Sequence, residues 1–177
     1  MGDSTGTRVG AATHAGHTLN SPHAAAVPSA CHGCATKTTV PRWEHFDHGA
    51  DIGVRGLGPT KSAAFEQAAV ALTAVIADPG RIQTRERVQI SCEAGDDELL
   101  LAAWLNAVVS QMAVRRMLFK RFEVELQGRR LTGTAAGERI SPERHQPAVE
   151  VKGATYTQLR VARTADGGWL AQTVVDV

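Results

Sequence analysis

The stretch "WEHFDHGADIGVRGLGPT", residues 43–60, predicts a β-hairpin followed directly by a helix. Residues 43–46 and 51–58 place apolar side chains at alternating or nearly alternating positions, and glycine and proline bound the two runs. We expect the two runs to pair as neighbouring strands. Thr60 then occupies a plausible N-cap position, where its hydroxyl can accept a hydrogen bond from the first helical turn.

Two amphipathic helices are expected from apolar residues that recur every three or four positions. The first helix follows Thr60 and ends at "DPG", residues 78–80, because proline cannot continue the hydrogen-bond ladder. The second is capped by Asp96 or Asp97 and runs to about Arg115. Their apolar stripes comprise Phe65, Ala68, Leu72, Val75 and Ile76 in the first helix, and Leu101, Trp104, Leu105, Val108 and Met112 in the second.

The remaining regular segments are predicted strands, and their close spacing favours antiparallel pairing. Short turns are expected at "QGRR" and "ADGG". The sequence contains no βαβ alternation and no internal repeat that we can detect. We therefore expect an α+β fold with two helices packed on a predominantly antiparallel β-sheet. The further strands are expected at residues 85–94, 118–126, 129–138, 156–163 and 168–177.

The 177 residues are enough for one ordinary domain. The first 42 residues contain no aromatic side chain and only four charged ones, so they cannot build a core. We expect residues 1–40 to be a disordered low-complexity tail and residues 41–177 to form the domain. Cys31 and Cys34 could supply half of a zinc site, but no matching second pair follows them.

Composition limits the classes of partner. The formal net charge is only +1, whereas a domain that binds nucleic acid by itself is usually clearly basic, so we expect RNA contact to be indirect or weak. There is no apolar run of about 18 residues and no secretory signal pattern, which predicts a soluble protein without a membrane partner. Three unevenly spaced cysteines agree with a reducing, cytoplasmic location.

Five separated motifs, in one order and at compatible spacing, resemble the archease family. They are "WEHFDHGADIGVRGLGPTKSAAFEQAA", "DDELLLAAWLNAVV", "LFKRFEV", "GERISPERHQPAVEVKGATYTQLRV" and "GGWLAQTVVDV". The resemblance covers residues 43–177 and leaves the N-terminal stretch outside it.

This resemblance implies a non-enzymatic accessory protein of a GTP-dependent RNA-splicing ligase. Such a ligase joins RNA ends that carry a 3′-phosphate or 2′,3′-cyclic phosphate to 5′-hydroxyl ends, in tRNA splicing or RNA repair. The resemblance implies an activator that promotes guanylylation of the ligase and multiple turnover. The ligase, and not the activator, uses the GTP. The resemblance also implies a divalent cation held by Asp51, Asp176 and Val177.

Elementary chemistry agrees with a calcium-type site at these positions. Ca²⁺ gathers six to eight oxygens, often from carboxylates and main-chain carbonyls. Asp51 begins one predicted strand and Asp176 ends another, so pairing those strands could bring the two carboxylates together. Val177 would add its carbonyl or a terminal carboxylate. Spacing alone favours a structural interpretation, in which Asp51 binds backbone amides while Asp176 frays into solvent, and only the family resemblance favours the metal site.

Three further residues are candidates for contact with the ligase or its nucleotide. Lys152 matches a charged position in a family signature, and Asp47 and His48 flank the predicted metal site in sequence. The chain has Gly153 and Thr157 where family members often carry alanine and histidine. A histidine beside acids resembles a general base, but no serine or cysteine nucleophile is patterned with His48.

Two other functions remain open from the sequence: a small metal-dependent hydrolase whose acids activate water, and a general protein chaperone. The sequence lacks a phosphate-cradling GxxxxGK[ST] loop and a zinc-binding histidine pair, which favours the activator.

The densest basic cluster comprises Arg115, Arg116, Lys120 and Arg121. It favours a cationic helix end over an RNA or partner contact. Cys92 is expected to be a buried, inert thiol on the apolar side of its strand.

Overall fold

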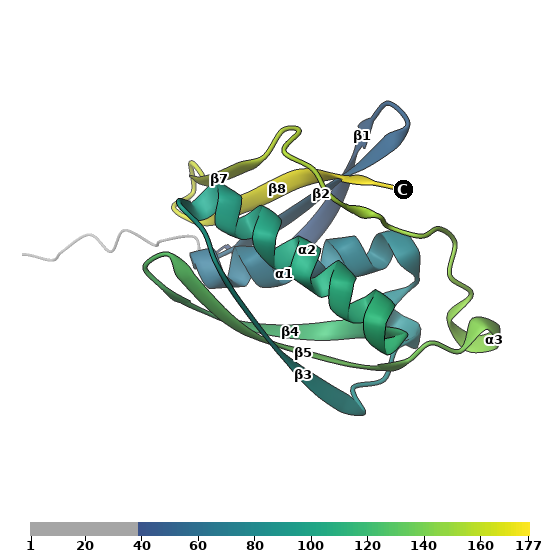
Figure 1. Ribbon diagram of the computed structural model, residues 1–177. Helices are drawn as coiled ribbons and strands as arrows, with labels where there is room; N and C mark the ends of the chain where they lie inside the picture. Colours follow the sequence, from purple (N-terminus) through teal and green to yellow (C-terminus); the bar gives the residue numbers. More distant parts are fainter. Residues whose placement is uncertain (1–38) are drawn as a thin grey trace, which may run out of the picture. The chain divides into compact units, whose positions relative to one another are not determined.

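The computed structural model describes residues 39–177 (Figure 1), and it confirms the predicted α+β class with antiparallel strands. In chain order the elements are β1 (Arg42–His48), β2 (Asp51–Gly58), α1 (Lys61–Ile76), the 3-10 turn η1 (Pro79–Arg81), β3 (Glu86–Glu93), α2 (Asp97–Arg115), β4 (Met117–Gln127), β5 (Arg130–Arg139), α3 (Pro142–His145), β6 (Gly153–Ala154), β7 (Arg160–Arg163) and β8 (Trp169–Asp176). The short elements η1, α3 and β6 were not predicted.

The strands divide between two sheets, whereas the sequence predicted a single one. The first sheet has the order β1-β2-β8-β6, and β7 also pairs with β8. The second has the order β3-β5-β4. The predicted hairpin is confirmed, because β1 pairs with β2 in an antiparallel register that runs from Arg42 opposite Leu57 to His48 opposite Asp51. The last strand, β8, lies inside the first sheet, because β2 pairs with one of its edges and β6 and β7 pair with the other.

The two long helices lie between the two sheets (Figure 1). Helix α1 contacts β2 and β8 of the first sheet and β4 of the second. Helix α2 contacts β3, β4 and β5 on one side and β6, β7 and β8 on the other. Each helix therefore needs apolar side chains on more than one face, and this arrangement closes the main core between the sheets.

Both predicted helix starts are confirmed by their capping hydrogen bonds. The Ala63 N–H donates to Thr60 Oγ1 at 3.1 Å, and the Leu99 N–H donates to Asp96 Oδ1 at 2.8 Å. These bonds satisfy backbone donors that have no partner inside the helix. Helix α2 ends at Arg115 and is capped by Arg116, which adopts a left-handed conformation with φ of 54°.

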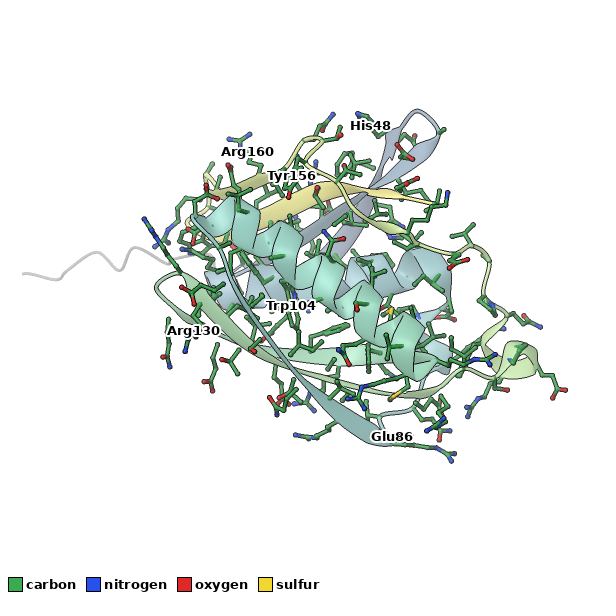
Figure 2. All side chains as sticks on the ribbon, in the orientation of Figure 1. His48, Glu86, Trp104, Arg130, Tyr156 and Arg160 are labelled. Atoms are coloured by element: carbon green, nitrogen blue, oxygen red, sulfur yellow. The ribbon has the colours of Figure 1, made fainter. Side chains whose placement is uncertain are left out.

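Trp104 of α2 is the largest fully buried side chain and fixes the helix against the second sheet (Figure 2). Its indole N–H donates to the Phe65 carbonyl of α1 at 3.4 Å, and its ring meets Phe122 edge-on at a centroid distance of 6.0 Å. A Cβ added at Gly133 of β5 would lie 2.6 Å from the indole ring. The indole ring therefore fills the space that a side chain at position 133 would occupy.

One predicted strand is shorter than expected. Residues 156–163 were predicted to be extended, but only Arg160–Arg163 form β7. Gln158 has φ of 50°, and the preceding residues bind β8 irregularly, with the Val174 N–H donating to the Thr157 carbonyl at 3.2 Å. Apolar alternation cannot detect such a left-handed residue, which is uncommon outside glycine.

The described region begins two residues before the predicted boundary at Pro41. Thr39 is buried, and its hydroxyl donates to Asp166 Oδ2 at 2.9 Å in the turn between β7 and β8. The rest of the predicted tail, with Cys31 and Cys34, lies outside the described residues.

Candidate functional site

His48, Asp51 and Asp176 lie in one row across the first sheet. His48 is directly opposite Asp51 in the β1–β2 ladder. Ile52 is opposite Val175 in the β2–β8 ladder, and continuing that register by one residue places Asp51 opposite Asp176. Directly opposed residues share a face of the sheet with Cβ atoms about 5 Å apart. The fold thus brings together the two acids that sequence reasoning paired.

The row faces away from the helices. Its neighbours along the strands, Ile52 and Val175, belong to the core, and side chains alternate between the two faces of a strand. Asp51 and Asp176 therefore stand on the outer face, where both are partly exposed. Figure 2 labels His48, the third residue of the row.

Asp47 does not share this face. It lies opposite Ile52, so its side chain leaves β1 on the helix side of the sheet. It is nevertheless exposed. Of the two residues that flank the predicted metal site in sequence, the structure places only His48 in the row with Asp51.

Lys152 ties down the end of β8. Its main-chain N–H donates to the Asp176 carbonyl at 2.9 Å. Its ammonium group donates to the Val177 main-chain oxygen at 3.0 Å and lies 3.8 Å from Asp176 Oδ1. The side chains of Lys152 and Asp176 are 64% and 51% exposed. The last residues of β8 are therefore held in place, and a cationic group already approaches the oxygens that were predicted to bind a metal.

The donor chemistry suits a hard cation. Two carboxylates held as close as opposed Cβ atoms, about 5 Å, would repel each other by about 1 kcal/mol in water and about 3 kcal/mol near a protein surface, and a cation would remove this cost. Within residues 39–177 no three His, Cys, Asp or Glu side chains converge closely enough to hold a metal by themselves. A site here would therefore depend on Asp51, Asp176 and the main-chain oxygen of Val177, completed by water. Lys152 can turn aside on its flexible stem.

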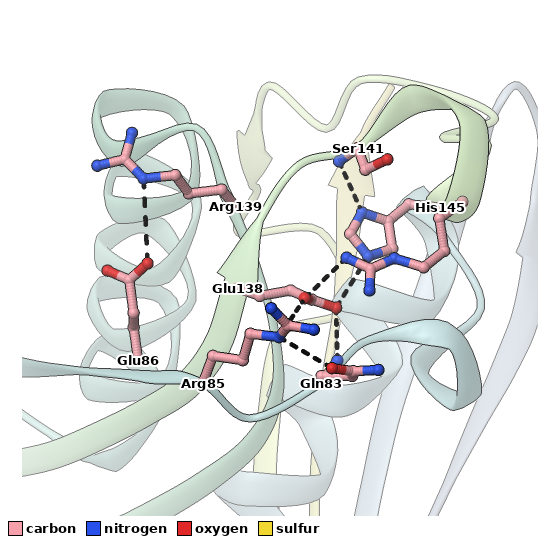
Figure 3. Close-up of polar contacts among 8 residues, drawn as sticks. Gln83, Arg85, Glu86, Glu138, Arg139, Ser141 and His145 are labelled. Carbon is pink, nitrogen blue, oxygen red and sulfur yellow. Dashed lines mark hydrogen bonds and ion pairs between the residues drawn. The ribbon is translucent and has the colours of Figure 1, made fainter.

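A second polar cluster, around Glu138 at the end of β5, was not predicted (Figure 3). The Glu138 side chain is only 4% exposed. It accepts hydrogen bonds from the Gln83 N–H at 2.7 Å and from His145 Nε2 at 3.2 Å, and it pairs with Arg144 at 2.7 Å and Arg85 at 3.4 Å. Burial disfavours the ionised carboxylate, but these donors outweigh it and hold the pKa of Glu138 below its usual value of 4.5.

His145 is also buried, and its protonation follows from its partners. The Ser141 N–H donates to His145 Nδ1 at 3.0 Å, so this nitrogen carries no proton and Nε2 donates to Glu138. Both ring nitrogens are therefore occupied in a neutral imidazole. The cluster therefore links β5, α3 and the segment before β3 that contains Gln83. It leaves neither ring nitrogen of His145 free for proton transfer.

The remaining sequence candidates separate in space. Arg115 and Arg116 end α2, as a cationic helix end would, whereas Lys120 and Arg121 belong to β4. Cys92 is half-buried on β3, a lesser burial than expected, and burial raises the pKa of its thiol. None of the described helices is both long and apolar enough to cross a membrane.

Comparison with known proteins gives one consistent result. The model of the Archease protein family matches residues 43–177. The chain is 37% identical over 140 residues to the protein archease of Pyrococcus abyssi and 38% identical over 140 residues to that of Pyrococcus furiosus; each alignment covers 77% of this chain and 99% of the relative. The fold is similar to the solution structure of Methanobacterium thermoautotrophicum protein 1598, with a TM-score of 0.68 and 29% identity over 76% of this chain and 98% of that one.

Proposed function

The chain belongs to the archease family, and from this premise we propose that it is a non-catalytic activator of a GTP-dependent RNA ligase. The ligase joins 3′-phosphate or 2′,3′-cyclic phosphate ends to 5′-hydroxyl ends and is the partner that uses GTP. The activator promotes its guanylylation and multiple turnover in tRNA splicing or RNA repair. Family membership supports an accessory role, and it favours neither the metal-dependent hydrolase nor the general chaperone.

The proposed activator works through a divalent cation, with Ca²⁺ the best match to the oxygen donors. Asp51 and Asp176 would hold it with their carboxylates and Val177 with its main-chain oxygen. The observation that supports this proposal is the strand register. Asp51 directly precedes Ile52, which pairs with Val175, the residue directly before Asp176. Residues 125 positions apart in the chain are thereby neighbours on one exposed sheet face.

Lys152 and His48 would border the cation and face the ligase. Lys152 already donates to Val177 and neutralises part of the negative charge of Asp176. An exposed ammonium group next to two carboxylates suits contact with a phosphate of the guanylylated ligase or of its nucleotide. Asp47 takes no part in this surface, because it leaves the opposite face of β1.

A multiple-turnover ligation assay tests the proposal. The ligase of the same organism is incubated with GTP, a divalent cation and RNA ends of the stated type, with and without this protein. Addition of the protein should raise the number of turnovers, and the protein alone should leave the RNA intact. No gain in turnover would remove the activator function, and RNA cleavage by the protein alone would instead indicate the hydrolase.

The metal site has a separate test. Calcium titration by calorimetry compares wild type with Asp51→Asn and with Glu125→Gln, an exposed carboxylate on the second sheet that serves as a matched control. Asp51→Asn should weaken calcium binding at least tenfold, since one of only two carboxylates is lost, while Glu125→Gln should bind like wild type. Equal calcium binding by all three proteins would exclude Asp51 as a ligand.

A further inference from the structure

An open cleft of about 730 Å³ lies on the second sheet, remote in the fold from the row of acids on the first. One wall is formed by Gly80 of η1 and by residues 82–85, which connect η1 to β3, and the other by Lys120 and Arg121 of β4. Arg85 and Thr84 add a guanidinium group and a hydroxyl to the first wall. Hydrogen-bond donors therefore dominate the side chains that line this cleft.

A β-bulge aims the two β4 cations into the cleft. In the β4–β5 ladder Phe119 is opposite Gly137 and Arg121 is opposite Ala136, so Lys120 is an extra residue without a partner. Side chains of a regular strand alternate, yet Lys120 and Arg121 are both exposed while Phe119 and Phe122 on either side are buried. A bulge re-aims side chains in this way at the cost of a broken ladder.

The surroundings of the cleft carry an excess of positive charge. Lys120 has no carboxylate within 4 Å in the described part of the chain. Arg121 pairs with Glu123 at 3.3 Å, but Arg87 approaches the same carboxylate at 3.8 Å. Arg85 shares the Glu138 carboxylate with Arg144. Four guanidinium groups thus share two carboxylates. With Lys120 the local excess is three positive charges, although the whole chain is nearly neutral.

We propose that this cleft binds phosphate groups, from either a single-stranded RNA backbone or a free nucleotide. Guanidinium and ammonium groups on two facing walls are the usual partners of phosphate oxygens. Among residues 39–177 no aromatic side chain lines the cleft for base stacking, so the proposed binding depends on phosphates and not on base sequence. This inference goes beyond ligase activation and does not rest on it, because the protein is tested alone.

The experiment measures fluorescence anisotropy of a labelled 12-nucleotide oligouridine and of a labelled GTP at about 50 mM salt. The test variant is Lys120→Gln with Arg121→Gln, which keeps polar side chains on the bulge. The matched control is Arg129→Gln with Arg130→Gln, two adjacent exposed arginines at the other end of the same sheet (Figure 2, Arg130 and Glu86 mark the two ends). Both variants lose two positive charges, so only the position differs.

The bulge variant should bind oligouridine about tenfold more weakly than wild type, and the control within about twofold of it. For two lost phosphate contacts on a single strand, the slope of log K against log salt should fall by about 1.4. Binding of RNA without GTP assigns the cleft to a polynucleotide, and binding of both assigns it to a single phosphate group.

The proposal is overturned if neither probe binds wild type, or if both double variants lose affinity equally, because general charge would then explain the binding. It is also overturned if hexaglutamate displaces oligouridine as effectively as tripolyphosphate does, which would indicate an acidic-peptide site. Thermal unfolding curves of the two variants, expected to match wild type within a few degrees, show that a loss of binding is not a loss of fold.

Discussion

Replacing Glu138 with alanine should lower the free energy of unfolding by about 3 to 4 kcal/mol, because this buried carboxylate on β5 satisfies donors from two other segments of the chain, residues 83–85 and 144–145. The partly buried Gln83 N–H and the buried His145 Nε2 would each lose their acceptor, at about 1 to 3 kcal/mol per unsatisfied donor. Arg85 and Arg144 are 65% and 39% exposed and can return to water, so they add little. The sum agrees with the cost of breaking a buried ion pair.

Guanidinium unfolding followed by circular dichroism at pH 7 measures this loss. Glu138→Gln keeps one oxygen to accept from the Gln83 N–H and should lose about half as much stability. Glu86→Gln is the control, since Glu86 is 51% exposed and lies 4.0 Å from Arg139, and it should change stability by less than about 0.5 kcal/mol. If Glu138→Ala were no more destabilising than Glu86→Gln, Glu138 would not hold the three segments together.

The same variants predict a pH dependence with a definite sign. The pKa of Glu138 is lowered in the folded protein, because its hydrogen bonds and ion pairs outweigh the burial that opposes ionisation. Its contribution is therefore fully present above the unfolded-state value of about 4.5 and is lost as the pH falls below it. The stability difference between wild type and Glu138→Gln should shrink between pH 5 and pH 3. A difference that stays constant over this range would contradict the lowered pKa.

Three further predictions concern packing, capping and reactivity. Gly56→Ala should destabilise the protein by about 1 to 3 kcal/mol, because its Cβ would lie 2.0 Å from the Ala64 carbonyl oxygen of α1, whereas Gly95→Ala, with its nearest atom 3.8 Å away, should be nearly neutral in thermal unfolding. Asp96→Ala should cost about 1 kcal/mol in chemical denaturation through loss of the α2 cap, and an unchanged midpoint would contradict that role. Burial raises the pKa of the Cys92 thiol, so iodoacetamide at pH 8 should label it more slowly than free glutathione, as followed by peptide mass spectrometry, and equal rates would argue against its burial.

Local signals explain which parts of the fold could be predicted. The caps at Thr60 and Asp96 and the hairpin at residues 43–58 depend on residues close together in sequence, and each is present in the structure. The division of the strands between two sheets depends on which distant strands pair, and apolar alternation does not encode partners. Gln158, the residue that shortens β7, has a positive φ, and its carbonyl accepts a hydrogen bond from Gln172 of β8 at 3.3 Å. A contact with so distant a residue leaves no signal in the local sequence.

The same distinction applies to the candidate sites. The pairing of Asp51 with Asp176 was implied by the resemblance to the archease family, since spacing alone did not favour it, and the strand register brings the two residues together. The burial of Glu138 and His145 could not be predicted, since both lie in a stretch of mixed charge that ordinarily faces solvent. The bulge at Lys120 did leave a trace, because two consecutive charged residues interrupt the alternation of "LFKRFEVEL".

The position of Asp176 is a consequence of hydrophobic register. Val175 is fully buried against the helices, and the Thr173 hydroxyl donates to the Thr155 carbonyl at 2.6 Å, so β8 is fixed on both sides. A slip of one residue would turn Val175 to the outer face and Asp176 into the core, at a cost of several kcal/mol for the buried carboxylate and the exposed valine together. The core that buries Val175 therefore also holds Asp176 beside Asp51. Asp176→Asn should change the acidic row without destabilising the fold, whereas Val175→Asp should disturb both.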